Sequence, residues 1–193
     1  MSTVGVPQSR KRLIIVGNRM NITFEMPAFN LQKQGIRSIV EPSLEDAVEC
    51  FLDVPESCIV DIEELDISGT PHPYLIKKLN EELISFGKRD SPHHAEVLDL
   101  SKPCKTIICA YTFQPRLYVC LRTPSKKVYI RCLTIKELAQ IQGFPATHQF
   151  SGNKQSVIKQ IGNAVPAKLI ECITQSILDV SQPKQTVRRK IRK

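Results

Sequence analysis

Two short stretches carry the side chains best suited to chemistry. In "GVPQSRKR", residues 5–12, Gln8, Arg10 and Arg12 stand at alternate positions, so an extended chain places them on one face. Pro7 restricts the residue before it and sets the angle at which the chain enters the stretch. Because arginine stays charged and its planar fork makes bidentate contacts, the two arginines are suited to holding phosphate or a polarised oxygen. An ordinary basic strand entry that forms surface ion pairs has the same spacing.

The second stretch is "QIGNAVP", which ends at Pro166. Gly162 permits a turn in which the backbone approaches another segment closely, and Asn163 then offers donor and acceptor groups at the start of a helix. A turn that does nothing more than begin a helix explains the same residues.

The elements that must position these stretches are predicted from apolar periodicity and capping residues. The run "RLIIVG" at 12–17 predicts a buried strand. A serine cap ahead of two acids predicts a helix over 42–52, and leucines on one face before Gly87 predict a surface helix over 74–87. Residues 88–103 are expected to form a loop.

Strand-like runs follow at 106–111, 116–121 and 127–133, and the turn between the last two indicates a hairpin. Thr134 and Glu137 then form a capping box for a helix that ends at the following glycine and proline.

A final helix is expected from about Pro166 to Val180, because proline favours the first turn and an apolar stripe follows it. The stripe consists of Leu169, Ile170, Ile173, Ile177 and Val180. Another surface must cover such a stripe.

Composition excludes several classes of protein. Trp is absent and aromatic residues are few, which argues against a stacking surface for single-stranded nucleic acid. No apolar run approaches the ~18 residues of a membrane helix, and no signal-peptide core is present. The seven cysteines are irregularly spaced without a C-x-x-C pair, which favours free thiols over zinc or disulfides. We therefore expect an intracellular protein, cytoplasmic or nucleoid-associated, with no metal site.

Charge is unevenly distributed. The last ten residues hold six basic side chains and no acid, which leaves only +2 of the formal +8 for the remainder. A solvated tail and non-specific binding of nucleic acid phosphates both fit this segment. Between Glu41 and Asp66 there are ten acids and no Lys or Arg, a run that would repel phosphate and is expected to face away from it.

Three segments in fixed order resemble the last three motif blocks of DNA cytosine-5 methyltransferases. They are "GVPQSRKRLIIVG" at 5–17, "RCLTIKELAQIQGFP" at 131–145 and "KQIGNAVP" at 159–166. The variable stretch between the first two blocks matches the place of the family's target-recognition region. The resemblance covers almost the whole chain except the basic tail.

The reaction that this resemblance implies is methyl transfer from S-adenosylmethionine to C5 of a cytosine flipped out of double-stranded DNA. C5 is a poor nucleophile, so a cysteine thiolate must first add to C6 while an acid and cations stabilise the electron-rich ring. The resemblance implies that Arg10 and Arg12 orient the flipped cytosine and its phosphate, with Gln8 supporting the loop.

The resemblance also implies that Asn163 and Ala164 contact the cofactor and that Arg131 braces the junction of the catalytic and recognition parts. A surface residue of the hairpin is the alternative for Arg131. The family's cofactor loop, its Pro-Cys nucleophile and its Glu-Asn-Val acid do not precede residue 5. Cys104 follows a proline but lies after the first block and leads into a strand, so we expect a packed thiol and not the nucleophile.

We expect an α/β fold that forms the C-terminal part of a doubly wound methyltransferase sheet, with a small mixed α+β target-recognition lobe. The expected parts are a catalytic segment at 1–25, the recognition region at 26–104, a return to the catalytic domain at 105–180 and a basic tail at 181–193. Polar and basic side chains of the recognition region could meet DNA or only decorate the surface: Lys77, Lys78, Lys88, Arg89, His93 and His94.

Several accounts of the chain remain open. It is a subunit of a split enzyme whose complementary polypeptide carries the nucleophilic cysteine and the cofactor loop, or a truncated remnant that at most binds DNA. A subunit that acts on RNA cytosines is a third account, and a misassigned start is a further possibility. The intact motif residues favour the split enzyme, which would be inactive as an isolated chain.

Overall fold

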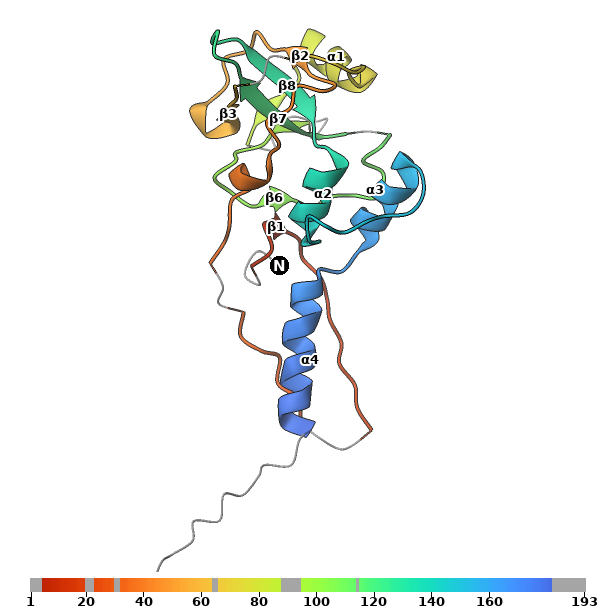
Figure 1. The fold of residues 1–193 in the computed structure, drawn as a ribbon. Coiled ribbons are helices and arrows are strands. Elements are labelled where there is room, and N and C mark those ends of the chain that lie inside the picture. Colours follow the sequence, from red (N-terminus) through yellow and green to blue (C-terminus); the bar gives the residue numbers. More distant parts are fainter. Residues whose placement is uncertain are drawn as a thin grey trace, which may run out of the picture.

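The centre of the fold is an antiparallel hairpin of β7 (Leu117–Arg122) and β8 (Val128–Cys132), as the sequence predicts. The structure is a computed structural model that describes residues 5–19, 23–29, 32–63, 66–87, 95–113 and 115–181. Thr123 closes the turn by donating its backbone N–H to the carbonyl of Lys127. The hairpin lies inside the main sheet, with other strands on both sides of it (Figure 1).

The hairpin extends on both sides into a mixed sheet. β2 (Val48–Glu49) pairs antiparallel with β8, while β3 (Ile59–Asp61) and β5 (Glu96–Val97) both run parallel to β7. β4 (Ser85–Phe86) pairs with β5. A mixed sheet with few helices confirms the α/β class and fits a fragment of a methyltransferase fold.

Alternate side chains of β7 enter two separate cores, because successive residues of a strand point to opposite faces. Val119 and Leu121 join a core that α2 and α3 cover, whereas Tyr118 and Cys120 join a core that contains Leu75 of α1. The first five residues of β7 are buried, as expected of a strand covered on both faces.

Four helices and two short 3-10 turns complete the described part of the chain. They are η2 (Arg37–Ile39), η3 (Glu56–Cys58), α1 (Pro73–Asn80), α2 (Ile135–Gln142), α3 (Lys154–Asn163) and α4 (Ala167–Ser181). The predicted capping box of Thr134 and Glu137 begins α2, and Gly143 ends it with a φ of 94°. α4 agrees with the final helix that the sequence predicts, while α3 was not predicted.

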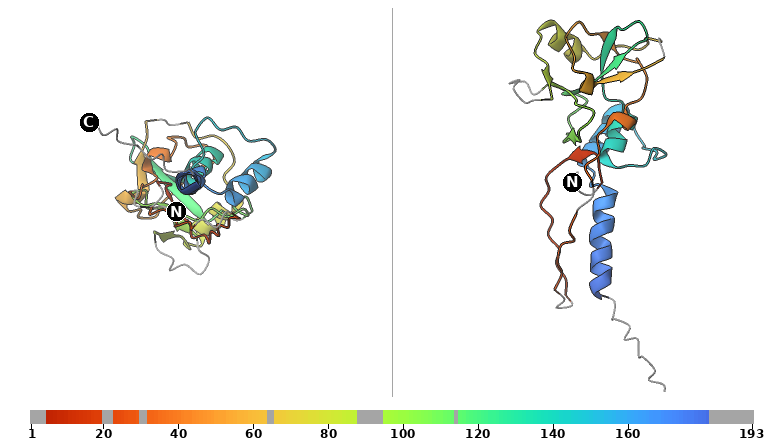
Figure 2. Two further views of the ribbon diagram at one scale, coloured as in Figure 1. Left: turned by 90° about the horizontal axis from the view of Figure 1, so that it is seen from below. Right: turned by 90° about the vertical axis from the view of Figure 1, so that its left-hand side faces the viewer.

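A projection extends from this body and consists of α4 and an N-terminal arm, described over residues 11–19 and 23–29. β1 (Gln8–Ser9) pairs in parallel with β6 (Cys104–Lys105) beneath the main sheet. From there the N-terminal segment runs out and returns beside α4, so its two legs lie against one side of that helix (Figures 1 and 2). The projection has a small buried cluster of Val6, Leu169 and Ile173.

Four predicted elements differ from the structure. Residues 12–17 form no strand, and most of their side chains are exposed. Residues 42–52 form a turn and then β2 in place of a helix, because β8 offers a strand partner there. The predicted helix over 74–87 is confirmed only as far as Asn80, before a turn with Glu82 at a φ of 53° and then β4. In place of a strand over 106–111, turns follow the short β6.

Some predictions fall outside the described residues. These include the basic tail from residue 182 and part of the expected loop with Lys88, Arg89, His93 and His94. The described end of that loop, residues 95–103, contains β5 and is therefore not all loop. Lys77 is exposed on α1, whereas Lys78 is buried with its ammonium over the ring of Tyr74. No helix within the described ranges is long and apolar enough to cross a membrane.

Candidate functional site

The first motif block lies at the base of the projection. Gln8 is in β1, where pairing with β6 sets it opposite Cys104. Its side chain is 0% exposed, and neither amide atom has a hydrogen-bond partner among the described residues. A buried amide without a partner costs about 1–3 kcal/mol, so the burial of Gln8 is unfavourable unless another group pairs with its amide.

Arg10 reaches from the first block to the third. It is buried, and its Nη1 donates to the carbonyl of Gly162 at 2.8 Å and, at 3.5 Å, to that of Ile107. Burial lowers the pKa of Arg10, and the nearby charge of Arg12 lowers it further. The guanidinium therefore satisfies the carbonyl of Gly162 at the C-terminal end of α3, where a helix leaves acceptors free.

Arg12 has a different environment. Its side chain is exposed, and its Nη1 donates to the carbonyl of the adjacent Lys11 at 2.8 Å. The sequence places Gln8, Arg10 and Arg12 on one face, yet the structure buries the first two and exposes the third. Arg12 is thus the member of this set whose cationic group faces solvent.

The third block, residues 159–166, ends α3 and leads directly into α4. Gly162 and Asn163 form the last turn of α3, so Gly162 is helical where the sequence predicts a turn, and Asn163 lies four residues before the start of α4. The predicted close approach is confirmed, because a Cβ on Gly162 would stand 2.6 Å from the backbone nitrogen of Cys109. Asn163 is exposed, and Ala164 follows it as the C-cap in extended conformation.

Gln142 joins the second block to the third. It is buried at the end of α2, and its Nε2 donates to the carbonyl of Ala164 at 2.5 Å. Its Oε1 has no hydrogen-bond partner within the described part of the chain. The sequence interpretation assigned this residue no role. The available signal was a polar side chain in "IQGFP" on the buried side of the helix.

Gly143 completes the contact of the three blocks. A Cβ at this position would lie 3.6 Å from Val6 of the first block and 3.8 Å from Pro166 of the third. Val6 and Gly143, more than 130 residues apart in sequence, therefore meet at one place, and Pro166 of the third block lies beside them.

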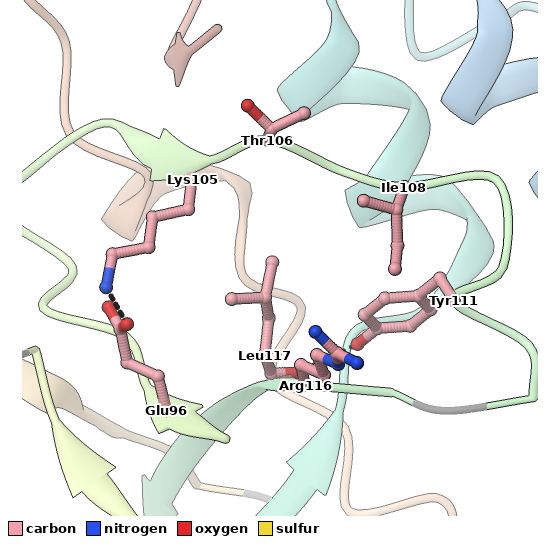
Figure 3. Close-up of a pocket in the computed structure, with 7 residues that line it drawn as sticks. All are labelled: Glu96, Lys105, Thr106, Ile108, Tyr111, Arg116 and Leu117. Atoms are coloured by element: carbon pink, nitrogen blue, oxygen red, sulfur yellow. Dashed lines mark hydrogen bonds and ion pairs between the residues drawn. The ribbon is translucent and has the colours of Figure 1, made fainter. Parts of the chain in front are cut away.

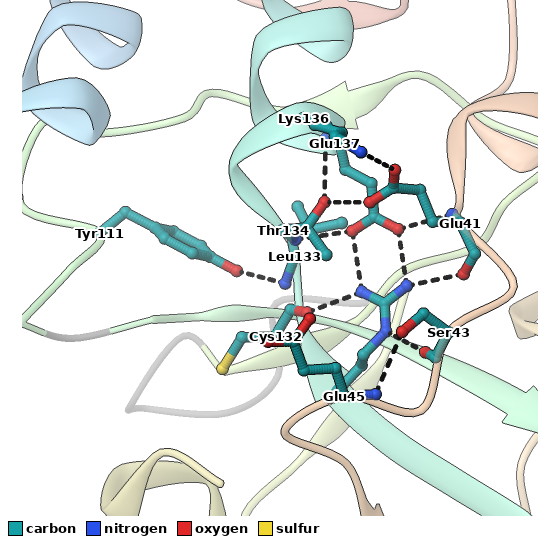
Figure 4. A network of polar contacts seen from close by, with 10 residues as sticks. Glu41, Ser43, Glu45, Tyr111, Cys132, Leu133, Thr134, Lys136 and Glu137 are labelled. Carbon is teal, nitrogen blue, oxygen red and sulfur yellow. Dashed lines mark hydrogen bonds and ion pairs between the residues drawn. The ribbon is translucent and has the colours of Figure 1, made fainter. Parts of the chain in front are cut away.

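Arg131 lies in a closed polar network. Its side chain is 1% exposed, and its guanidinium donates to both carboxylate oxygens of Glu137, at 2.7 and 2.9 Å. It also donates to the carbonyls of Glu41, Ser43 and Cys132 (Figure 4). Glu137 in turn accepts from the backbone N–H groups of Glu41 and Thr134. The network ties the start of α2 to residues 41–43 of the predicted recognition region.

A pocket of about 290 Å³ opens beside β6 (Figure 3). The ammonium of Lys105 pairs there with the buried carboxylate of Glu96. Thr106 donates from its hydroxyl to the carbonyl of Ser9 at 3.1 Å, which fixes the pocket next to β1.

Cys104 is a packed thiol. It is buried in the core that α2 and α3 cover, and burial raises its pKa to about 12. The thiolate is the reactive form of cysteine, so this side chain is a poor nucleophile near neutral pH. The seven cysteines are all free, and no cluster of three or more possible metal ligands occurs among the described residues.

The comparisons with known proteins agree with the motif blocks. Residues 1–179 match the model of the C-5 cytosine-specific DNA methylase family. The chain is 29% identical to Type II methyltransferase M.PspPI of Psychrobacter sp. (strain TA137), over 90% of the chain and 42% of that protein. It is 31% identical to Type II methyltransferase M.MthTI of Methanothermobacter thermautotrophicus, over 90% of the chain and 52% of that protein.

The chain thus spans about half the length of the curated relatives that it matches. No solved structure matches it. The family model matches nearly the whole chain, and the structure brings the three motif blocks together. The chain therefore belongs to the C-5 cytosine-specific DNA methylase family.

Proposed function

We propose that the chain is one part of a DNA cytosine-5 methyltransferase and acts with a complementary polypeptide. It supplies target recognition, the arginines that orient the base and phosphate, and one wall of the S-adenosylmethionine pocket. The complementary polypeptide carries the nucleophilic cysteine and the cofactor loop. The observation that carries this proposal is the junction of the three motif blocks through Arg10–Gly162 and Gln142–Ala164.

Within this proposal the two arginines have different tasks. Arg12 is exposed and contacts the flipped cytosine or its phosphate, because its charged fork is accessible to double-stranded DNA. Arg10 is buried against Gly162 and holds the first block in register with the third. Gln8 supports the same strand from inside.

The end of α3 fits one wall of a cofactor pocket. Asn163 presents its amide to solvent, and the bond from Gln142 fixes the backbone of Ala164 beside it. When bound, S-adenosylmethionine supplies the methyl group. Asn163 and Ala164 bind and orient it.

The polar network around Arg131 supports the division of the chain into catalytic and recognition parts. The Arg131–Glu137 pair and its bonds to residues 41–43 support a junction between the recognition region at 26–104 and the returning catalytic part at 105–180. Residues 1–25 belong to the catalytic part, and 181–193 form a basic tail. We expect the protein to act inside the cell, in the cytoplasm or at the nucleoid.

Transfer of a labelled methyl group from S-adenosylmethionine tests this function. The chain is assayed alone and together with the part of M.MthTI that lies outside the match, on double-stranded DNA and on an RNA transcript. We expect no transfer by the chain alone and transfer to DNA by the pair. In this proposal the nucleophile comes from the partner, because Cys104, the cysteine of this chain that follows a proline, is buried and burial raises its pKa to about 12.

Arg12→Ala should lower transfer by the pair about 10²–10³-fold, as expected when a charged group loses its contact in the transition state. Lys11→Ala is the matched control, since Lys11 is an adjacent exposed cation, and should retain most of the activity. Transfer by the chain alone would refute the two-part enzyme. DNA binding without transfer by any pair would favour a remnant, and transfer to RNA alone would favour the RNA subunit.

A further inference from the structure

A second cavity, of about 640 Å³, has no role in the proposed function. Its lining comes from residues 41–46 and 70–73 of the predicted recognition region and from segments 111–115, 132–136 and 154–158 of the returning part. Figure 4 shows the portion of the lining that holds Glu41, Thr134 and Lys136. The volume lies within the range of about 300–1,000 Å³ that is typical of sites for small molecules.

Much of the lining of this cavity is apolar. Tyr111, Leu133 and Ile158 belong to the core that α2 and α3 cover, and they line the cavity together with three prolines, Pro71, Pro73 and Pro115. Core side chains are closely packed and proline fixes its own backbone φ, so this part of the lining is rigid. Such a lining suits a ligand with an apolar body.

The charged groups of the cavity do not balance. Three carboxylates face two ammonium groups, those of Lys136 and Lys154, which leaves one negative charge. His72 adds no charge, because its Nδ1 accepts a hydrogen bond from a backbone N–H and is therefore unprotonated. The carboxylate of Glu41 is already matched, by Lys136 at 3.5 Å and by the hydroxyl of Thr134 at 2.8 Å.

Glu45 and Asp46 hold the remaining carboxylates. Glu45 is exposed, and its carboxylate has no ion pair among the described residues. Asp46 accepts the backbone N–H of Thr70 through Oδ1 at 2.7 Å, which fixes its orientation. Burial raises the pKa of Cys132 to about 12, while Lys154 lowers this pKa and Asp46 raises it, so both charges lie near the thiol. Lys154 thus offsets Asp46 in part, and Glu45 carries the excess charge.

The hydroxyl of Thr112 adds a hydrogen-bonding group to the same cavity. Its Oγ1 is buried and has no hydrogen-bond partner within the described part of the chain. A buried hydroxyl without a partner is unfavourable, so a ligand that supplies one is stabilised by it. The cavity therefore combines an apolar lining, an unmatched carboxylate and an unpaired hydroxyl.

We propose that this cavity binds a small organic cation, whose apolar body lies against Tyr111 and Ile158 and whose ammonium or guanidinium group pairs with Glu45 and Asp46. A phosphate or carboxylate ligand would instead meet the excess negative charge. The same cationic chemistry has two sources, a free amine and a basic side chain of the tail at 181–193. Either occupant would contact both the recognition region and the returning part.

The test uses the full chain, labelled with ¹⁵N, and three probes of similar shape: 2-phenylethylamine, 2-phenylethanol and phenylacetate, which are cationic, neutral and anionic. Nuclear magnetic resonance titrations give the affinities and the residues that shift. We expect a dissociation constant of about 1 mM for the amine, as for other ligands of this size, and about tenfold weaker binding of the alcohol. Phenylacetate should not bind measurably, and the shifts should lie within 41–46, 70–73 and 132–136.

The double variant Glu45→Gln with Asp46→Asn should bind the amine about tenfold more weakly and the alcohol as before. Asparagine tolerates the φ of 59° at position 46 and can still accept from Thr70, so the fold is preserved. Glu63→Gln is the matched control, since Glu63 is an exposed acid of the same run that does not line the cavity, and it should change nothing. Lys154→Gln should strengthen binding of the amine about twofold, because it removes a like charge.

Four results would overturn the proposed site. They are no measurable binding of the amine, equal affinity for the three probes, shifts outside the cavity, and unchanged affinity in the double variant. A synthetic peptide of residues 182–193 that displaces the amine from the wild-type chain would support the site and assign the tail as its occupant. A peptide that leaves the amine bound would support a free amine as the ligand.

Discussion

Glu137→Gln tests whether the Arg131 network stabilises the fold. The substitution keeps the shape of the side chain but removes its charge. The guanidinium of Arg131, 1% exposed, then lacks its counter-ion. Removing one partner of a buried ion pair costs about 3–5 kcal/mol, because the remaining charge is desolvated without compensation. We expect a loss of about 3 kcal/mol, since the carbonyls of Glu41, Ser43 and Cys132 still accept from the guanidinium.

The free energy of unfolding is measured by urea denaturation followed by far-ultraviolet circular dichroism. Lys168→Ala is the matched control: it breaks the exposed Lys168–Glu171 pair at 2.9 Å and should change stability by less than about 0.5 kcal/mol. Adding Arg131→Met to Glu137→Gln should recover part of the loss, because it removes the uncompensated charge. A cost below about 1 kcal/mol for Glu137→Gln, with an unchanged denaturant slope, would refute the reasoning.

Three further predictions concern the site. Gly162→Ala should destabilise the chain by about 1–3 kcal/mol in thermal melts, since its Cβ would stand 2.6 Å from backbone, whereas Gly17→Ala, with nothing within 4 Å, should be nearly neutral. Iodoacetamide at pH 8 should modify the exposed Cys109 in the folded chain and spare Cys104; mass mapping that finds Cys104 modified equally fast would contradict its burial. Because the pKa of Cys104 rises on folding from 9.0 to about 12, its contribution to stability is complete below pH 9 and declines as the pH rises toward 12.

The elements predicted correctly are those whose signals are local. The capping box of α2 lies within four residues, and the β7–β8 hairpin needs only a short turn between apolar runs. α3 also has a local signal, because the side chain of Asn153 accepts from the backbone of Ser156. It was missed because Gly162 indicated a turn. In the structure that glycine stays helical and is needed for the close approach of Cys109.

The elements predicted wrongly depend on distant partners. Residues 42–52 have a plausible helix cap, yet the side chain of Ser43 accepts from Glu45 within a turn and the backbone of Asp46 donates to Ser68. β8, some 80 residues further along the chain, then provides the partner of β2. Helix propensity is a weak prior that such tertiary contacts override.

The sequence predicts which types of residue form the site, but it does not predict which residues they contact. Spacing indicates that Arg10 and Arg12 share a face, and nothing local reveals that Arg10 bonds to Gly162, 152 residues away. Gln142 was missed for the same reason, since its partner is a backbone carbonyl of another block.

The region around Arg131 and the region near the projection differ in how many of their buried polar groups have partners and how many of their apolar side chains are covered. Around Arg131 every nitrogen of the guanidinium has an acceptor, and the neighbouring carboxylate of Glu137 is bonded in turn. Near the projection, the amide of Gln8 is buried without a partner among the described residues, and Leu13 is exposed. Buried unpaired amides and exposed aliphatic side chains both cost free energy, so association would stabilise this region. If the chain acts with a complementary part as proposed, the contact that covers this region would also lie next to the first motif block, which holds Arg12.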